Sequence, residues 1–402
     1  MISPEMIEKA AVAIQSATRK TPLLRSEIFE KAVKSKFPIY LKLENLQHTG
    51  SFKARGALNK LLSIEAEAKK KGVITASAGN HGQGVAFHAQ RLGISAKIVM
   101  PEGTPLVKIL STKRWGADVV FFGESYAEAA AHAAKLQVDE GRIYVHAFDD
   151  EAVMAGQGTI ACEVLTERPE IESIWAPIGG GGLLGGIGTF FKSKKPQGKI
   201  IAIQAAGSST FLPSLEAGKP ITLEKVSTIA EGIACKRMGD QSFEACRKVV
   251  DDTVVVNDEE ISAGILWLLE NEHVFAEGCG GASIAALLQR PDLITGPTCV
   301  VVSGGNLDVN LLTRIIERGL VKNGRLVMFD VLIPDAPGSL YKLLQVFADL
   351  KASVMQINHE RVFQSVGLKD VYTTISLETQ GPEHVERIRR TLADKGWQAH
   401  FH

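Results

Sequence analysis

The segment Ser51–Gly56 (SFKARG) places Lys53 at the start of a predicted helix, after a predicted strand. A lysine in the first turn of a helix faces the positive end of the helix dipole, which disfavours its ammonium form. A lysine held partly neutral can bond covalently to a carbonyl carbon and can act as a general base. Taken alone, the segment is also compatible with a solvated surface lysine, because lysine and arginine together number 45 in this chain.

A second segment, Ser77–Gly82 (SAGNHG), also lies between a predicted strand and a predicted helix. Backbone N–H groups at a helix start, together with serine and asparagine side chains, suit the binding of a carboxylate. Serine and asparagine are also common N-caps, so the segment alone is compatible with a purely structural helix start. His81 alone is more typical of a packed or capping histidine than of a ligand.

The most unusual segment is a run of glycines, GGGGLLGG at residues 179–186, directly after a predicted strand. Consecutive glycines let backbone amides approach a phosphate closely at the start of a helix. Gly180, Gly182 and Gly185 also satisfy the G-x-G-x-x-G pattern of dinucleotide sites. Such a site requires an acidic residue about 20 residues further on. The strand predicted at 200–205 carries Gln204 and no acid, which favours the phosphate hypothesis.

A fourth segment, Val300–Asn306 (VVVSGGN), ends a predicted buried strand in the hydroxyl of Ser303 and two glycines. The four segments together offer an amine, a carboxylate pocket, a phosphate cradle and a hydroxyl. Pyridoxal phosphate needs such a set: a lysine for its aldehyde, donors to its phosphate and a partner for its ring nitrogen. The sequence therefore predicts pyridoxal 5'-phosphate as the cofactor.

These segments require a fold that brings them together. From about residue 38 to 320, apolar runs alternate with segments of helical period, which favours parallel sheets covered by helices on both faces. In such α/β folds ligands bind in the crevice at the carboxyl ends of the strands. Strands are expected at 38–43, 73–77, 97–100, 119–122, 174–178, 200–205, 253–256 and 298–303, with helices such as 80–92, 104–115, 124–137 and 259–272 between them.

The last part of the chain has a different pattern. Residues 325–402 predict the order βαββαβ, which is enough for a small α+β domain. The boundary between the two domains is expected within 319–325 (GLVKNGR). The expected strands are 325–333, 353–363, 370–378 and 397–401, and the expected helices are 339–350 and 382–395.

Composition excludes several classes of function. The 402 residues predict two or three domains, and the 45 basic residues balance 45 acidic ones. The chain thus lacks the charge expected for binding nucleic acid or an anionic membrane. The five cysteines form no CxxC pair, and no stretch reaches about 18 continuous apolar residues. We expect no signal peptide, because the first residues contain no basic segment that leads into an apolar run. We expect a cytoplasmic protein with reduced thiols.

Five motifs occur in one order along the chain: SFKARGA (51–57), SAGNHGQG (77–84), GQGT (156–159), GGGGLLGG (179–186) and SGGN (303–306). Through them the chain resembles the threonine/serine dehydratases (ammonia-lyases) of the tryptophan-synthase-β-like class of pyridoxal-phosphate enzymes. The resemblance implies a two-lobed, fold type II catalytic domain at 1–322, with a smaller lobe at about 45–150. The segment DAPGSL (335–340) and the βαββαβ order resemble a regulatory ACT domain at 325–402.

The resemblance also implies a role for each matching residue. Lys53 would hold the cofactor and remove the α-proton of the substrate, and Phe52 would flank the cofactor ring. Asn80 would donate to the phenolic oxygen, and Ser303 would face the pyridine nitrogen. The substrate carboxylate would bind Ser77, Ala78, Gly79, Asn80 and His81, and the phosphate would bind the backbone of Gly179, Gly180, Gly181, Gly182 and Leu183.

These roles imply a lyase. The neutral hydroxyl of Ser303 would stabilise a protonated pyridine less than a carboxylate does, which favours β-elimination over transamination. The implied reaction converts L-threonine to 2-oxobutyrate and ammonia, and L-serine to pyruvate, in a homodimer or homotetramer. The ACT-like domain would bind an amino-acid effector, isoleucine or valine, through Asp335 and Gly338; a pure oligomerisation module is the alternative.

Other functions stay open at this point. A serine racemase of this family carries a serine as its second base where this chain has Ala78. A hydroxyaspartate dehydratase would use the same scaffold, and a non-catalytic amino-acid sensor is the alternative from another class. Glu231 lies in a region that binds a cation in some relatives, so a metal ion also stays open. Cys279 is interpreted as a small core residue.

Overall fold

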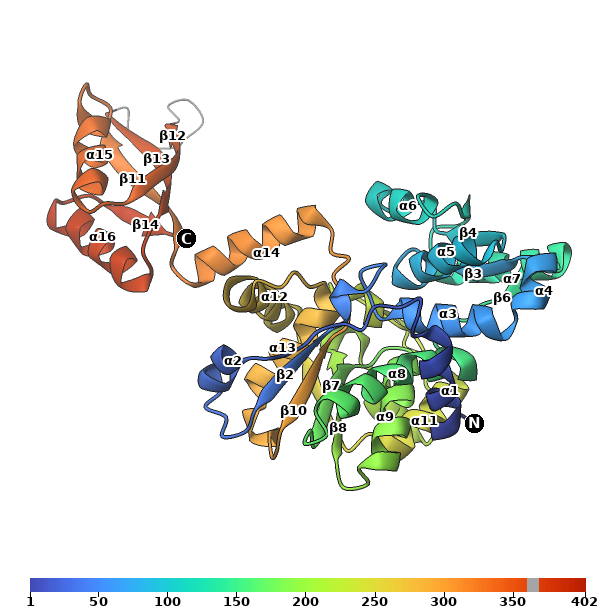
Figure 1. Cartoon of the computed structure of the whole chain (residues 1–402). Coiled ribbons are helices and arrows are strands. Elements are labelled where there is room, and N and C mark those ends of the chain that lie inside the picture. The colour runs from blue at the N-terminus through green and yellow to red at the C-terminus, as the bar shows by residue number, and fades with distance from the viewer. Residues whose placement is uncertain (360–368) are drawn as a thin grey trace. The chain divides into compact units, whose positions relative to one another are not determined.

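The computed structural model describes residues 1–359 and 369–402, and the chain divides into two compact units, 1–308 and 309–402 (Figure 1). The first unit contains two mainly parallel sheets, and the second contains an antiparallel sheet. The expected α/β class and the expected small α+β domain are both confirmed. The end of the strand expected at 353–363 lies outside the described residues.

The larger sheet of the first unit is built from apolar strands. In spatial order these are β1 (Leu23–Arg25), β2 (Ile39–Leu43), β10 (Thr298–Val302), β7 (Ser173–Pro177), β8 (Lys199–Ala205) and β9 (Asp252–Val256). Every residue of β2, β7 and β10 is buried, as in parallel strands that are covered on both faces. The short β1 pairs antiparallel with β2 and was not predicted.

The smaller sheet lies within the lobe expected at about 45–150. Its parallel strands are β5 (Asp118–Phe121), β4 (Ala96–Met100), β3 (Val73–Ala76) and β6 (Ile143–Tyr144). A separate core under this sheet contains Val73, Val85 and Ile98. The two lobes therefore have their own cores, and the carboxyl ends of their strands are available to form a crevice.

Helices cover both sheets of the first unit. They are α1 (Pro4–Ile14), α2 (Glu27–Ala32), α3 (Lys53–Ser63), α4 (Glu65–Lys71), α5 (Asn80–Leu92), α6 (Leu106–Lys113), α7 (Tyr126–Glu140), α8 (Glu151–Glu167), α9 (Gly182–Lys194), α10 (Phe211–Ala217), α11 (Asp240–Val249), α12 (Asp258–Trp267) and α13 (Gly278–Gln289). Shorter helical turns are η1 (Glu44–Leu46), η2 (Ala206–Ser208), η3 (Glu231–Ile233), η4 (Leu268–Glu272) and η5 (Pro291–Leu293).

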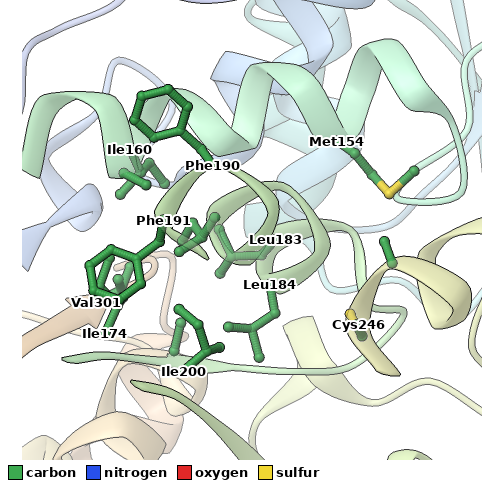
Figure 2. Packing of buried hydrophobic residues seen from close by; sticks show 14 of the residues in the cluster. Met154, Ile160, Ile174, Leu183, Leu184, Phe190, Phe191, Ile200, Cys246 and Val301 are labelled. Carbon is green, nitrogen blue, oxygen red and sulfur yellow. The ribbon is translucent and has the colours of Figure 1, made fainter. Parts of the chain in front are cut away.

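The main core lies between the larger sheet and the helices α8 and α9. Figure 2 shows Phe191 of α9 near Ile174 of β7, and Leu184 of α9 near Ile200 of β8, and all four side chains are fully buried. A fully buried side chain of this size contributes about 1.5–3 kcal/mol. Leu183 belongs to the same core and ends the glycine run, so this packing anchors the run.

The second unit has the expected βαββαβ order after a leading helix. Its elements are α14 (Val309–Lys322), β11 (Leu326–Pro334), α15 (Ser339–Asp349), β12 (Ser353–His359), β13 (Asp370–Glu378), α16 (Pro382–Asp394) and β14 (Ala399–Phe401). The core includes Phe329, whose ring stacks on Phe401 with centroids 4.6 Å apart. The division between units at 308 and 309 precedes α14, whereas the expected boundary at 319–325 covers the last residues of α14 and the turn after it.

A buried ionic network lies at the base of α3. The guanidinium of Arg55 makes two hydrogen bonds of 2.8 Å to Glu44, from Nε and Nη2. It makes two more to Glu163, of 2.6 and 2.9 Å. Lys42 pairs with the same Glu163 and donates to the carbonyl of Thr21 at 2.8 Å. The network therefore joins β2, η1, α3 and α8 with equal numbers of positive and negative charges.

The charges of this network are sustained by one another. Burial alone would raise the pKa of Glu44, but the Arg55 guanidinium and the Lys42 ammonium outweigh it and hold that pKa below its usual range. Burial opposes the charge of Arg55 as well, and its two carboxylate partners raise its pKa. Removing one member would leave an uncompensated charge in the interior.

We expect Arg55→Met to lower the free energy of unfolding by about 3–5 kcal/mol, because the fully buried Glu44 carboxylate loses its guanidinium partner. Urea unfolding of the full chain at pH 7, followed by circular dichroism, would measure the loss. Lys69→Met is the matched control, since Lys69 pairs with Glu65 on the exposed surface of α4 and should change little. Equal effects of the two substitutions would contradict the prediction.

Candidate active site

A cavity opens at the carboxyl ends of β7 and β10, beside the starts of α3, α5 and α9. It brings together all nine residues that the sequence predicts to bind the cofactor, although they come from four distant segments. The lining residues are Phe52, Lys53, Asn80, Phe148, Pro177, Gly179, Gly180, Gly181, Gly182, Leu183, Gly232, Ile233, Glu277, Cys279 and Ser303.

Lys53 is the first residue of α3 and lies in the wall of this cavity. Its amine donates a hydrogen bond of 2.8 Å to the carbonyl of Ala147 and lies 5.3 Å from the centre of the Phe52 ring. Burial lowers the pKa of the amine below its usual range, and Cys235, Cys279 and Glu277 only partly oppose that shift. A larger share of neutral amine makes a lysine a better nucleophile and base.

The loop before Lys53 is held by the loop that follows β10. The N–H of Phe52 donates to the carbonyl of Ser303 at 3.1 Å, and the N–H of Gly305 donates to the carbonyl of Gly50 at 2.8 Å. Both bonds are possible because β2 and β10 are parallel neighbours, so the segments that follow them lie at the same sheet edge. This pairing fixes the lysine segment relative to Ser303.

The glycine run connects β7 to α9 through a turn that requires glycine. Gly181 has φ +96°, and a Cβ on Gly179 would lie 2.7 Å from Cα of Ile233. A Cβ on Gly180 would overlap the ring of Phe148. The carbonyl of Gly180 accepts a hydrogen bond of 2.6 Å from Oγ of Ser242. The glycines at the start of α9 therefore line the cavity with backbone and no side chains of their own, which suits a phosphate.

Ser303 presents a buried hydroxyl without a partner. Its side chain is 1% exposed, it lines the cavity, and Oγ makes no hydrogen bond within the described chain. Buried hydroxyls are normally satisfied, and this one lines the cavity, so it is available to bond to a ligand there. The ring nitrogen of pyridoxal phosphate would supply an acceptor for it.

The segment predicted to bind the carboxylate is only partly in the cavity lining. Asn80 lines the cavity, whereas Ser77, Ala78, Gly79 and His81 do not. Oγ of Ser77 accepts hydrogen bonds from the N–H groups of Gly79 and Gly82, at 3.2 and 3.0 Å. That arrangement is the structural helix start that the sequence left open as an alternative.

His81 is packed behind the cavity. Its Nε2 lies 2.9 Å from the carbonyl of Val145. Burial first, and the Lys53 charge second, lower the pKa of His81 to about 3, so the ring is neutral at neutral pH. This environment is the packed histidine that the sequence favoured over a ligand.

Six lining residues were not proposed from the sequence as site residues: Phe148, Pro177, Gly232, Ile233, Glu277 and Cys279. Glu277 is 9% exposed, and burial raises its pKa to about 7. Oε1 of Glu277 accepts a hydrogen bond of 2.7 Å from Nδ2 of Asn80. The available indication was the place of Glu277 at the start of a glycine-rich helix, two residues before Cys279.

Cys279 and Glu231 had been singled out in the sequence for other reasons. Burial raises the pKa of the Cys279 thiol well above its usual range, so it stays protonated, as expected of a small core residue. Glu231 forms an ion pair with Lys108 of α6. Within the described residues, no cluster of three or more His, Cys, Asp or Glu side chains could hold a metal ion.

The amine, the glycine backbone and the hydroxyl that line the cavity indicate a class of enzyme. A compound with an aldehyde, a phosphate and a ring nitrogen satisfies the Lys53 amine, the glycine run and the Ser303 hydroxyl together, so the site fits pyridoxal phosphate. The sequence pattern described as "Pyridoxal-phosphate dependent enzyme" matches residues 14–305. The chain belongs to this family, and pyridoxal phosphate is its cofactor.

Individual proteins similar to this chain include two named for threonine and one serine racemase. The chain is 42% identical to a protein named L-threonine ammonia-lyase from Thermotoga maritima over 398 residues, which cover 99% of each chain. The processed threonine deaminase isoform 2 of Solanum lycopersicum superposes with TM-score 0.74 at 35% identity, over 78% of this chain and 92% of that one. Maize serine racemase also reaches TM-score 0.74, at 31% identity over 80% and 98%. In the described residues no helix is long and apolar enough to span a membrane.

We expect Gly180→Ala to weaken cofactor binding at least tenfold, because the added Cβ would overlap the Phe148 ring and displace the glycine run. Titration of cofactor-free protein with pyridoxal phosphate, followed by absorbance, would measure the affinity. Gly103→Ala is the control, since a Cβ there meets no atom within 4 Å. Unchanged affinity in Gly180→Ala would argue against a phosphate at this run.

Proposed function

We propose that this chain is a lyase that converts L-threonine to 2-oxobutyrate and ammonia by β-elimination, and L-serine to pyruvate as a second reaction. The observation that carries the proposal is the meeting of the Lys53 amine and the unpartnered Ser303 hydroxyl in one cavity. The full-length similarity to a protein named L-threonine ammonia-lyase supports threonine as the substrate.

When bound, pyridoxal phosphate supplies an electron sink that acidifies the α-hydrogen of an amino acid. In the proposed reaction, Lys53 holds the cofactor and then, as a free amine, takes the α-proton at Nζ. Its lowered pKa keeps a share of that amine unprotonated near neutral pH. Asn80 donates to the phenolic oxygen, and the N–H groups of 179–183 hold the phosphate.

Ser303 directs the reaction toward elimination. As a neutral hydroxyl it gives the ring nitrogen a hydrogen bond without the negative charge that would stabilise a protonated ring. A ring that stays unprotonated would be a weaker electron sink, which favours loss of the β-hydroxyl over return of a proton to the α-carbon. With the α-proton lost to Lys53 and the hydroxyl leaving as water, the product is an enamine, which tautomerises to an imine that water hydrolyses to the oxo acid and ammonia.

The substrate carboxylate lies at the start of α5 in this proposal. Backbone N–H groups of Asn80 and His81 supply positive potential there. Racemisation would require a second base at position 78, and Ala78 has no ionisable side chain. Elimination is therefore favoured over racemisation, although the scaffold resembles maize serine racemase.

We expect Lys53→Ala to lower 2-oxobutyrate formation from threonine by at least a thousandfold, because the cofactor loses its covalent partner and the α-proton loses its base. The assay uses purified protein with added pyridoxal phosphate and follows the oxo acid. Lys69→Ala, on the exposed face of α4, should retain wild-type activity. A yellow wild-type protein that forms no oxo acid from threonine or serine would exclude this substrate class.

We further propose that the second unit senses an amino acid, isoleucine or valine, through Asp335 and Gly338, in a cytoplasmic homodimer or homotetramer. Gly338 precedes α15 with φ +87°, and a Cβ on it meets no atom within 4 Å. An N-terminal helix end with open space beside it suits a small zwitterion. The βαββαβ order of this unit supports the regulatory assignment.

We expect Gly338→Asp to remove the response to isoleucine or valine while basal turnover stays within about twofold. Aspartate tolerates a left-handed backbone better than most residues, so the unit should still fold. The measurement is threonine turnover against effector concentration for both proteins. A variant with an unchanged effector response would rule out this site.

A further inference from the structure

Glu277 is a buried carboxylate in the cavity wall for which the proposed reaction has no use. It immediately precedes α13, and its N–H donates to the carbonyl of Gly304 at 3.0 Å. A Cβ on Gly304 would overlap Oε1 of Glu277, so the carboxylate lies directly against the Ser303 loop. Its position is thus fixed from both the backbone and the side-chain end.

The Glu277 carboxylate accepts the last hydrogen bond of a chain that runs from the Asn306 amide through the Asn80 amide. Nδ2 of Asn306 donates to the carbonyl of Thr49 at 2.8 Å and to Oδ1 of Asn80 at 2.7 Å. Nδ2 of Asn80 then donates to Oε1 of Glu277 at 2.7 Å. Because both ends of the Asn80 amide are bound, its orientation is determined, and its second N–H is left for the cavity.

We propose that Glu277 is a positioning residue: its carboxylate holds the Asn80 amide toward the cofactor, and loss of its charge releases that amide and lowers activity. The kinetic part rests on the proposed function, whereas the effect on the bound cofactor does not. An ionised carboxylate accepts a charge-assisted bond from an amide, and a protonated one accepts a weaker bond and must find an acceptor of its own.

The groups around Glu277 bring the pKa of its carboxyl close to neutral pH. Burial raises its pKa to about 7, the bond from Asn80 lowers it, Glu231 raises it and Lys108 lowers it. Lys53 of α3 and Cys279 of its own helix also face it, since the charge of Glu277 acts on both. Glu277 is therefore ionised above about pH 7, and activity falls as the pH drops through that value.

Two charges of opposite sign offer a test that leaves Glu277 in place. Lys108 on α6 and Glu231 on η3 form an ion pair; their side chains are 17% and 65% exposed. Glu231→Gln should move the midpoint of the Glu277 titration to lower pH, and Lys108→Gln should move it to higher pH. Low ionic strength maximises both shifts, because salt screens such charges.

The first experiment follows the visible absorbance of protein-bound pyridoxal phosphate from pH 5.5 to 8.5 without substrate. Wild type should change with a midpoint near pH 7, Glu277→Gln should be flat, and the Lys108 and Glu231 variants should shift oppositely. A midpoint retained in Glu277→Gln would overturn the proposal. If that variant fails to fold, midpoints unmoved in both charge variants would overturn it equally.

The second experiment measures kcat/KM for threonine over the same range. Wild type should lose activity in a step near pH 7 that matches the absorbance midpoint, and Glu277→Gln should be about tenfold slower at pH 8 without that step, since it mimics the protonated form. Protonation of the Lys53 amine lowers the activity of both proteins at acid pH. A step that stays at the wild-type midpoint in Glu277→Gln would contradict the kinetic part. Absorbance shifts without any threonine turnover would contradict the proposed function but would support the positioning role of Glu277.

Discussion

A neutral cluster of four charges, three of them fully buried and Glu163 partly so, holds the lysine segment in its place. Lys42, Glu44, Arg55 and Glu163 come from β2, η1, α3 and α8. Taking these groups out of water is compensated only when all four elements are in their final positions. Arg55 follows Lys53 by two residues on the same helix, so the arrangement that neutralises the charges also presents the amine to the cavity.

The positions of the site residues also depend on which strands are neighbours in the larger sheet. Residues far apart in sequence meet because β2, β10 and β7 are parallel neighbours in one sheet. Backbone bonds then join the segment before Lys53 to the Ser303 loop, and the core around Leu183 anchors the glycine run. The cavity is thus assembled from backbone and core packing, and few of its polar groups bond to each other directly.

Much of this arrangement was predictable because its causes are local. Apolar runs between turns predicted the main parallel strands, and the rule for strand ends predicted that Lys53, the glycine run and Ser303 meet. Glu277 and Phe148 were missed because their burial arises from elements distant in sequence, and for Glu277 the glycine-rich helix start that follows it was the one local sign. Ser77 turned away from the cavity because its hydroxyl bonds to N–H groups of its own loop.

The amide of Asn80 also joins the two lobes. Asn80 begins a helix of the smaller lobe, while both hydrogen-bond partners of its amide, Glu277 and Asn306, belong to the larger lobe. Any widening of the crevice that admits or releases a ligand must break these bonds or carry the amide away from the cofactor. Ligand exchange and the contact of Asn80 with the cofactor therefore depend on the same two hydrogen bonds. A substitution that changes how easily the crevice opens will also change how Asn80 is held for the reaction.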